Sequence, residues 1–394
     1  MTIKEPAFTL GIEEEYHLVE TTTGALALDP PRTLFSECKA ELGPQVSPEF
    51  LRSQLEVGTR VCATIAEARA DLTRLRGTIV RIAGTYGLAP IAASTHPFAD
   101  WTASQPTDRQ RYRAIASDLQ AVGRRLVICG MHVHVAIDDD ELRIDLMNQA
   151  RYFLPHLLAL STSSPFWQGE ATGLRCYRLA VYNEVPRSGL PGQLESWSEY
   201  QSTIDVLVRS KVIQDASKIW WDIRPSARFP TLEMRITDVC TRIEDAVAVA
   251  ALYRCILRML YRLRRNNQRW RQYPLFLLNE NRWRAQRYGF ADGLFDFGRG
   301  EIMPFAGLLD ELLAFVRPDA EHFGCVAEVE HTRTIVARGT SADAQLAEFN
   351  RALEQGQAPK EALQAVVAML VRATAGNGVA VKRRPKAAKA AGQE

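Results

Sequence analysis

FTLGIEEEYHLV, residues 8–19, decides the fold, because three consecutive glutamates stand inside an apolar, β-type segment. Alternate side chains of a strand point to opposite faces, so Glu13 and Glu15 share one face and Glu14 points to the other. Two carboxylates on one face of a central strand repel each other, and burial makes their charge costly. We therefore predict that Glu13 and Glu15 hold a hard divalent metal, with Glu14 as a control on the opposite face.

The composition is that of an ordinary globular chain, with 394 residues, 46% hydrophobic and 24% charged. The 48 basic and 46 acidic residues give a net charge of +2, which offers no reason to expect nucleic acid or a membrane as partner. The length allows two or three domains. No Gly/Ser-rich or Pro-rich linker divides the chain, however, so we predict one domain over residues 1–375 and a disordered Lys/Ala-rich tail over residues 376–394.

The expected location is the cytoplasm. Seven cysteines are scattered without a CxxC pair, which favours reduced thiols. The N-terminus is acidic and lacks the basic and apolar regions of a signal peptide. No apolar stretch approaches the roughly 18–20 residues of a membrane span.

Two further strands carry polar residues that resemble ligands. Residues 53–57 predict a strand with Glu56 on one face, either as a ligand or as an accident of an edge strand. Residues 126–137, LVICGMHVHVAI, alternate so that His132 and His134 share a face. A pair of histidines two residues apart on one strand face is a common metal-ligand arrangement. The alternative is a pair of core histidines bonded to backbone.

A second dense stretch covers residues 219–240, IWWDIRPSARFPTLEMRITDVC. We predict strands over residues 219–223 and 232–239, with Glu233 and Arg235 on the same face. An acidic and a basic residue so placed could bind a metal and an anion. The alternative is an amphipathic strand that faces water on one side.

Loop residues supply further candidates. His96 lies at a strand end in THPFADW, where binding residues often lie. The long loop of residues 161–192 includes Arg178 and Arg187, and arginine suits bidentate binding of carboxylate or phosphate. A basic-aromatic patch, NENRWRAQRYG, includes Arg287. The alternatives are a structural loop around His96 and solvated arginines elsewhere.

Helical periodicity predicts helices over residues 63–84, 141–160 and 244–265. The polar residues of the strands are mainly oxygen donors, which favours Mg²⁺ or Mn²⁺ over zinc. Several carboxylates beside arginines suggest metals that bridge a nucleotide triphosphate. Neither GxxxxGK[ST] nor GxGxxG occurs, so metal and arginine would hold the phosphates in place of a glycine loop.

Six blocks carry a family resemblance, namely GIEEEY, QLEVGTRVC, STHPFADW, GMHVHVAI, WWDIRPSARFPTLEMRITDVC and NRWRAQRYG. In this order they resemble the bacterial carboxylate–amine ligases similar to glutamate–cysteine ligase type 2. The resemblance implies an α+β, glutamine-synthetase/guanido-kinase-like fold, an antiparallel sheet funnel with helices on its outer face. It also implies a homo-oligomer that uses ATP and Mg²⁺, or Mn²⁺, to join an amino-acid carboxylate to an amine such as cysteine through an acyl phosphate.

The resemblance also implies roles for single residues. Arg235 would contact phosphate and act in catalysis together with Glu13. Related ligases often carry an acidic residue four positions before Glu56, whereas this chain has Arg52 there. The expected metal ligands are Glu13, Glu15, Glu56, His132, His134 and Glu233. The expected substrate and nucleotide contacts are Arg178, Arg187, Asp222, Arg224, Arg287 and His96.

Two rival functions fit the same residues. One is a phosphotransferase on this fold, with a guanidino acceptor and no ligation. The other is a non-catalytic member that binds a nucleotide or an amino acid. The number of costly charges in the strands argues against a pure binder.

Overall fold

Strand β1 (Leu10–Glu20) is central in a seven-stranded antiparallel sheet in the computed structural model of the chain, which describes residues 4–376. It pairs with β3, β4 and β5, and the strand order is β10–β11–β5–β1–β3–β2 with β4 beside β1. The other strands are β2 (Val46–Pro48), β3 (Gln54–Gly58), β4 (Leu88–Ile91), β5 (Met131–Ala136), β10 (Ile223–Pro225) and β11 (Thr231–Met234). The strands predicted over residues 8–19 and 53–57 are confirmed, and the one predicted over 126–137 is confirmed in its second half.

The two faces of β1 differ as the alternation predicts. Leu10, Ile12 and Glu14 are buried on one face, whereas Glu13 and Glu15 are only partly buried on the other. The first face is covered by helices. The second face therefore remains available to line a cavity.

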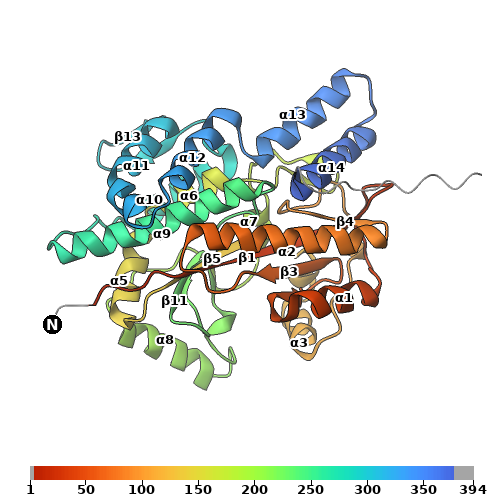
Figure 1. Cartoon of the computed structure of the whole chain (residues 1–394). Helices are drawn as coiled ribbons and strands as arrows, with labels where there is room; N and C mark the ends of the chain where they lie inside the picture. Colours follow the sequence, from red (N-terminus) through yellow and green to blue (C-terminus); the bar gives the residue numbers. More distant parts are fainter. Residues whose placement is uncertain (1–3, 377–394) are drawn as a thin grey trace, which may run out of the picture.

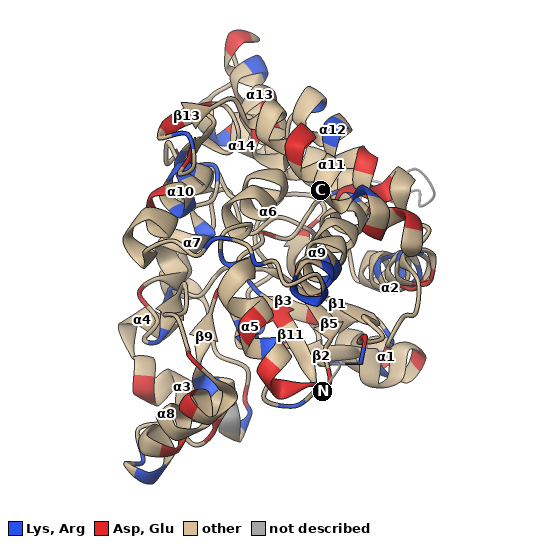
Figure 2. Cartoon of the chain, turned by 90° about the vertical axis from the view of Figure 1, so that its left-hand side faces the viewer, with Lys and Arg blue, Asp and Glu red and all other residues tan. Residues whose placement is uncertain are grey.

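Helices α2 (Ile65–Thr85) and α9 (Ile243–Arg265) pack against each other and against the buried face of the sheet (Figure 1). Helix α2 begins with a capping box, in which Thr64 and Glu67 each accept a hydrogen bond from the other's backbone N–H. Its apolar residues recur at helical spacing and are buried, as the periodicity predicts. The basic last turn of α9 is favourable at a helix C-terminus (Figure 2).

The remaining elements surround this core. The other helices are α1 (Arg32–Leu42), α3 (Gln110–Leu119), α4 (Ala121–Arg124), α5 (Asp140–Ala150), α6 (Leu154–Ser161), α7 (Arg178–Tyr182), α8 (Trp197–Arg209), α10 (Leu275–Tyr288), α11 (Phe305–His322), α12 (Val326–Arg338), α13 (Ser341–Glu354) and α14 (Pro359–Ala375). Three two-stranded sheets pair β6 (Phe166–Trp167) with β7 (Glu170–Ala171), β8 (Ser188–Gly189) with β9 (Trp220–Trp221), and β12 (Leu294–Asp296) with β13 (Glu301–Met303).

Three sequence predictions need correction. The strand predicted over residues 219–223 is divided between β9 and β10, which belong to different sheets. The single helix predicted over residues 141–160 is wrong, because α5 ends at Ala150 and α6 begins at Leu154. Pro155 explains the break, since it lacks an N–H and fits only the first turn of a helix. The strand predicted over residues 232–239 ends at Met234, although an isolated bridge between Gly130 and Asp238 keeps the segment beside β5.

The α+β prediction agrees with this architecture of an antiparallel sheet and packed helices. Lys/Arg and Asp/Glu are interspersed over the surface, as the small net charge suggests (Figure 2). Within residues 4–376, no helix combines the length and the apolar character needed to cross a membrane. The single domain stays a prediction, and its predicted tail lies outside the described residues from position 377 onward.

Candidate active site

A cavity of about 750 Å³ opens on the face of the sheet opposite α2 and α9. Strands β1, β3, β5, β10 and β11 all contribute side chains to it, and so do the segments that follow β2 and α7. Its charged and polar lining includes Glu13, Glu15, Ser47, Glu49, Gln54, Glu56, His132, His134, Arg178, Arg224, Glu233 and Arg235. The strand-borne residues singled out in the sequence therefore converge on one site.

The register of the strands causes this convergence. Glu13 lies opposite His132 across β1 and β5. His134 lies opposite Glu233 across β5 and β11. Directly opposed side chains of an antiparallel pair have Cβ atoms about 4.5–5.5 Å apart, so each pairing places two functional groups within reach of a shared ligand.

The first group of potential metal ligands is Glu13, His134 and Glu233, whose donor atoms all lie within 4.8 Å of one another. Glu13 Oε2 lies 3.2 Å from His132 Nδ1, and its Oε1 lies 3.5 Å from His134 Nε2. Burial alone would raise the pKa of Glu13, but hydrogen bonds with the two histidines outweigh it and hold the pKa well below its usual value. Glu13 is therefore a carboxylate at neutral pH.

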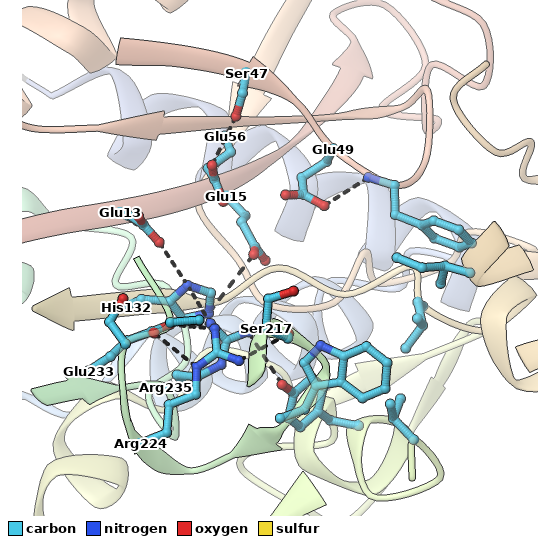
Figure 3. A pocket seen from close by; sticks show the side chains of 18 of the residues that line it. Glu13, Glu15, Ser47, Glu49, Glu56, His132, Ser217, Arg224, Glu233 and Arg235 are labelled. Carbon is cyan, nitrogen blue, oxygen red and sulfur yellow. Dashed lines mark hydrogen bonds and ion pairs between the residues drawn. The ribbon is translucent and has the colours of Figure 1, made fainter. Parts of the chain in front are cut away.

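The second group is Glu15, Glu49 and Glu56, again with donor atoms within 4.8 Å (Figure 3). Burial, followed by the charges of Glu13, Glu49 and Glu15, raises the pKa of Glu56 well above its usual value. Burial and the charge of Glu15 raise the pKa of Glu49 to about 7. Ser47 Oγ donates to Glu56 at 2.9 Å, which does not offset the crowding of negative charge.

Glu233 is held between two arginines. Arg224 Nε donates to Glu233 Oε2 at 2.9 Å, and Arg235 donates to Oε1 (Figure 3). Burial alone would raise the pKa of Glu233, but the charges of Arg235 and Arg224 outweigh it and hold the pKa well below its usual value. Glu233 and Arg235 both line the cavity as a paired acid and base, although Arg235 lies just beyond the end of β11.

These donor sets fit hard divalent cations. His134 is half-buried, and its Nε2 is shielded from solvent and faces Glu13 Oε1 at 3.5 Å. In the second group, three carboxylates face one another and the pKa values of Glu49 and Glu56 are raised, so a cation would remove the repulsion. Oxygen donors predominate in both groups, as Mg²⁺ and Mn²⁺ prefer. His132 belongs to neither triplet, but it lies between Glu13 and Glu15.

Glu49 is the cavity residue that the sequence reasoning missed. Arg52 stands where related ligases often carry an acidic residue, and it pairs with Asp29 at 3.1 Å and does not line this cavity. Glu49 supplies a third carboxylate instead, from the turn between β2 and β3. The available signal was an acidic residue seven positions before Glu56, next to Phe50 in a short connection.

Two predicted contact residues lie elsewhere. His96 is buried, and its Nε2 lies 2.9 Å from the carbonyl oxygen of Gly24. Asp222 is fully buried and accepts from Arg282 Nε at 2.6 Å, behind the cavity wall. Neither lines the cavity, so contact of His96 or Asp222 with substrate or nucleotide stays a prediction.

Two predicted arginines are also engaged outside the cavity. Arg187 Nε donates to the carbonyl oxygen of Lys218 at 3.0 Å, and its guanidinium stacks on Trp220. Arg187 thus packs against Trp220, which lines the cavity. Arg287, on α10, donates to the carbonyl oxygen of Gly173. Local backbone acceptors hold both side chains away from the cavity.

Arg178 does line the cavity, as predicted. Its Nη2 donates to the carbonyl oxygen of Arg235 at 3.0 Å, and its Nη1 donates to that of Ile236 at 3.2 Å. The guanidinium lies so close to Gly130 that a Cβ there would come within 2.5 Å of Nη2. Gly130 is therefore required for this placement.

Comparison with known proteins identifies the class. The family model of glutamate–cysteine ligase family 2 matches residues 9–369. Proteins from Rhodospirillum rubrum and Jannaschia sp., both named "Putative glutamate–cysteine ligase 2", are 60% and 53% identical over 94% of this chain and 97% of their own lengths. The chain belongs to this family and is therefore an ATP-dependent ligase that acts on small molecules with the help of a divalent metal.

Solved structures agree on the fold. Glutamate–cysteine ligase of Francisella tularensis, in complex with AMP, aligns over 96% of this chain and 91% of its own, with a TM-score of 0.67 and 12% identity. The bifunctional glutathione synthetase of Pasteurella multocida aligns over 93% of this chain, with a TM-score of 0.67 and 17% identity. This chain spans 52% of that longer protein. The predicted glutamine-synthetase-like α+β class is confirmed.

Proposed function

We propose that the protein is a carboxylate–amine ligase that forms an amide through an acyl phosphate, with glutamate or a similar acid as the carboxylate and cysteine or another amine as the acceptor. A carboxylate oxygen of the acid attacks the γ-phosphorus of ATP, and ADP leaves. The amine nitrogen then attacks the acyl carbon, and phosphate leaves. The observation that carries the proposal is the convergence of the two ligand groups with Arg178, Arg224 and Arg235 on one cavity.

The two ligand groups would hold divalent cations. Glu13, His134 and Glu233 would hold one, and Glu15, Glu49 and Glu56 another, with His132 between them. When bound, Mg²⁺ supplies electrostatic stabilisation of phosphate oxygens as negative charge shifts during transfer.

Arg235 and Arg224 place two positive charges at the part of the cavity where the phosphates of ATP would bind. Each donates to Glu233, which keeps both guanidinium groups fixed at the cavity wall. Nε of Arg235 is buried and makes no hydrogen bond. A donor that is already oriented can stabilise charge on the transferred phosphoryl group without reorganisation. Arg235 is thus the residue best placed to contact that group.

A second cavity of about 560 Å³ adjoins the first and shares the turn from Ser226 to Phe229 with it. It is lined by the aromatic rings of Trp197, Tyr200 and Phe229. Phe229 is 55% exposed and packs edge-on against His134 at a centroid distance of 6.3 Å. The adenosine portion of ATP would lie here, because a base can stack on the exposed ring of Phe229 beside the phosphate end.

The acceptor fits at the opposite side of the main cavity. Phe50, Tyr112, Ile115 and Leu119 form an apolar wall there, next to Glu49. Phe50 and Tyr112 pack edge-to-face at a centroid distance of 6.0 Å. This wall would receive the side chain of the amine substrate.

The test is an ADP-release screen of the purified protein with ATP and Mg²⁺ over pairs of acids and amines, followed by mass analysis of the products. We expect ADP, phosphate and an amide only when both substrates are present. The Glu13→Gln variant should lose amine-dependent ADP release, and full activity in that variant would contradict the proposal. A phosphorylated acceptor without amide would favour a phosphotransferase, and ATP binding without turnover would favour a non-catalytic binder.

A further inference from the structure

Glu14 and Arg76 form an ion pair that is sealed from solvent behind the cavity, with exposures of 0% and 2%. Arg76 Nε donates to Glu14 Oε2 at 2.7 Å, and Nη2 donates to Oε1 at 2.6 Å. Tyr16, two residues along β1, donates its hydroxyl to the same carboxylate. The carboxylate therefore has a bidentate partner and a third donor, which fixes its orientation.

The same guanidinium grips a second segment. Nη1 donates to the carbonyl oxygen of Thr241 at 2.8 Å, and Nη2 donates to that of Cys240 at 2.7 Å. These carbonyls follow the strand segment that carries Glu233 and Arg235. Arg76 on α2 thus connects β1, which carries Glu13 and Glu15, with the segment that follows Glu233.

A buried ion pair is a weak source of stability, because desolvation of two charges can exceed their mutual attraction. Its better-attested use is to specify one register. A slip of β1 by one residue would turn Glu13 and Glu15 toward the helices and Glu14 toward the cavity. On the side of the helices, the Arg76 guanidinium can pair with the single carboxylate of Glu14. In the slipped register the two carboxylates of Glu13 and Glu15 would compete for it, which disfavours that register.

We propose that Arg76 and Glu14 are a positioning pair that fixes the register of β1. This register makes Glu13 and Glu15 face the cavity, close enough to the other ligands to hold metal ions. This inference rests on the proposed function in one respect, since it takes Mg²⁺ to be the ion that those carboxylates hold. Neither side chain lines the cavity, so any effect on the metal must pass through β1 or through the segment that follows β11.

The experiment compares two variants that each neutralise a buried, arginine-paired carboxylate. Glu14→Gln breaks the positioning pair. Asp319→Asn is the matched control, because Asp319 on α11 is fully buried, accepts from Arg258 and Arg262 at 2.8 and 2.9 Å, and lies outside the cavity lining. Both variants should lose thermal stability. Mg²⁺ affinity is measured by calorimetry on the full chain, well below each unfolding midpoint.

We expect Glu14→Gln to weaken Mg²⁺ binding about tenfold, in the range seen when outer partners of metal ligands are removed. Asp319→Asn should bind Mg²⁺ as the wild type does. Equal affinities in the two variants would overturn the inference. If Glu14→Gln does not fold, Arg76→Lys keeps the charge but loses the bidentate grip, and wild-type Mg²⁺ affinity in that variant would overturn the inference equally. A wild-type protein that binds no Mg²⁺ would instead contradict the proposed function.

Discussion

Glu15 and Glu56 lie directly opposite each other across β1 and β3. Like charges at such a position destabilise a sheet. The repulsion affects the pKa of Glu56, because burial and the neighbouring charges of Glu13, Glu49 and Glu15 raise it well above its usual value. The metal-free sheet thus holds an internal repulsion that a divalent cation would relieve, and this relation leads to the first prediction.

Glu56→Gln should make the metal-free protein more stable and weaken its stabilisation by Mg²⁺, leaving only the part that comes from the group of Glu13, His134 and Glu233. Removal of one repelling carboxylate should raise the free energy of unfolding at pH 8, because a carboxyl whose pKa is raised by folding lowers the stability at a pH above its unfolded pKa. The wild type should instead gain about 2.7 kcal/mol when Mg²⁺ is at 100 times its dissociation constant. Denaturant unfolding with and without Mg²⁺ measures both effects. Glu354→Gln, an exposed change on α13, is the control and should alter neither.

Mg²⁺ binding should weaken as the pH falls below about 7. Burial and the charge of Glu15 raise the pKa of Glu49 to about 7, so a proton competes with the metal for this carboxylate in that range. Metal binding should therefore release protons, and more of them at pH 6.5 than at pH 8.5. Calorimetry in buffers of different ionisation enthalpy counts these protons. Glu49→Gln should release fewer protons at pH 6.5, and an unchanged count would assign them to another group.

The sequence predicts much of this site because period-two alternation fixes which residues share a face. Glu13 and Glu15 on β1, and His132 and His134 on β5, face the cavity as their alternation requires. What alternation cannot provide is the register between strands, which pairs Glu13 with His132 and Glu15 with Glu56. That register depends on contacts between segments far apart in the chain.

Residues in irregular segments were predicted less well, because no periodicity reports where they point. Glu49 lies in a turn and was missed, although it completes a triplet of carboxylates. His96 and Arg187 lie in loops rich in functional residue types, yet nearby carbonyl oxygens satisfy them. Alternation also treats Glu14 as a neutral control, whereas its pairing with the buried Arg76 makes it costly to change.

His156 should make stability depend on pH far from the cavity. Burial among Tyr152, Phe153 and Phe305 lowers its pKa from 6.5 to about 4. Between pH 6.5 and 4 the unfolded chain binds a proton at this position that the folded chain does not bind, so stability falls with falling pH across this window. The loss of stability caused by His156 reaches about 3 kcal/mol at the lower end of this pH window.

The variant His156→Gln isolates this contribution, because it removes the titrating group and leaves the other ionisable residues unchanged. From pH 7 to pH 4.5 the wild type should lose up to about 3 kcal/mol more free energy of unfolding than His156→Gln loses. His322→Gln is the control, because His322 is exposed at the end of α11. A difference that does not vary with pH would show that His156 is protonated inside the fold.

Gly130→Ala should disturb Arg178 and, through it, the cavity. The added methyl would come within 2.5 Å of Arg178 Nη2 and 3.0 Å of Cζ. The guanidinium can move only by giving up its bonds to the carbonyl oxygens of Arg235 and Ile236. Overpacking of this kind costs about 1–3 kcal/mol, and the displaced cation should also raise the KM for an anionic substrate. Denaturant unfolding and steady-state kinetics measure the two effects.

Two comparisons decide whether the clash with Arg178 is the cause. Gly77→Ala, in the middle of α2, adds a methyl that would meet no described atom within 4 Å, so it should stabilise the protein by about 0.5–1 kcal/mol, as alanine does in a helix. In an Arg178→Met background the methyl of Gly130→Ala meets a flexible apolar chain, so its cost should fall by more than half. Residues that do not interact have additive effects, so an undiminished cost in that background would place the strain in the backbone between Gly130 and Glu15, which share hydrogen bonds at 2.6 and 3.1 Å.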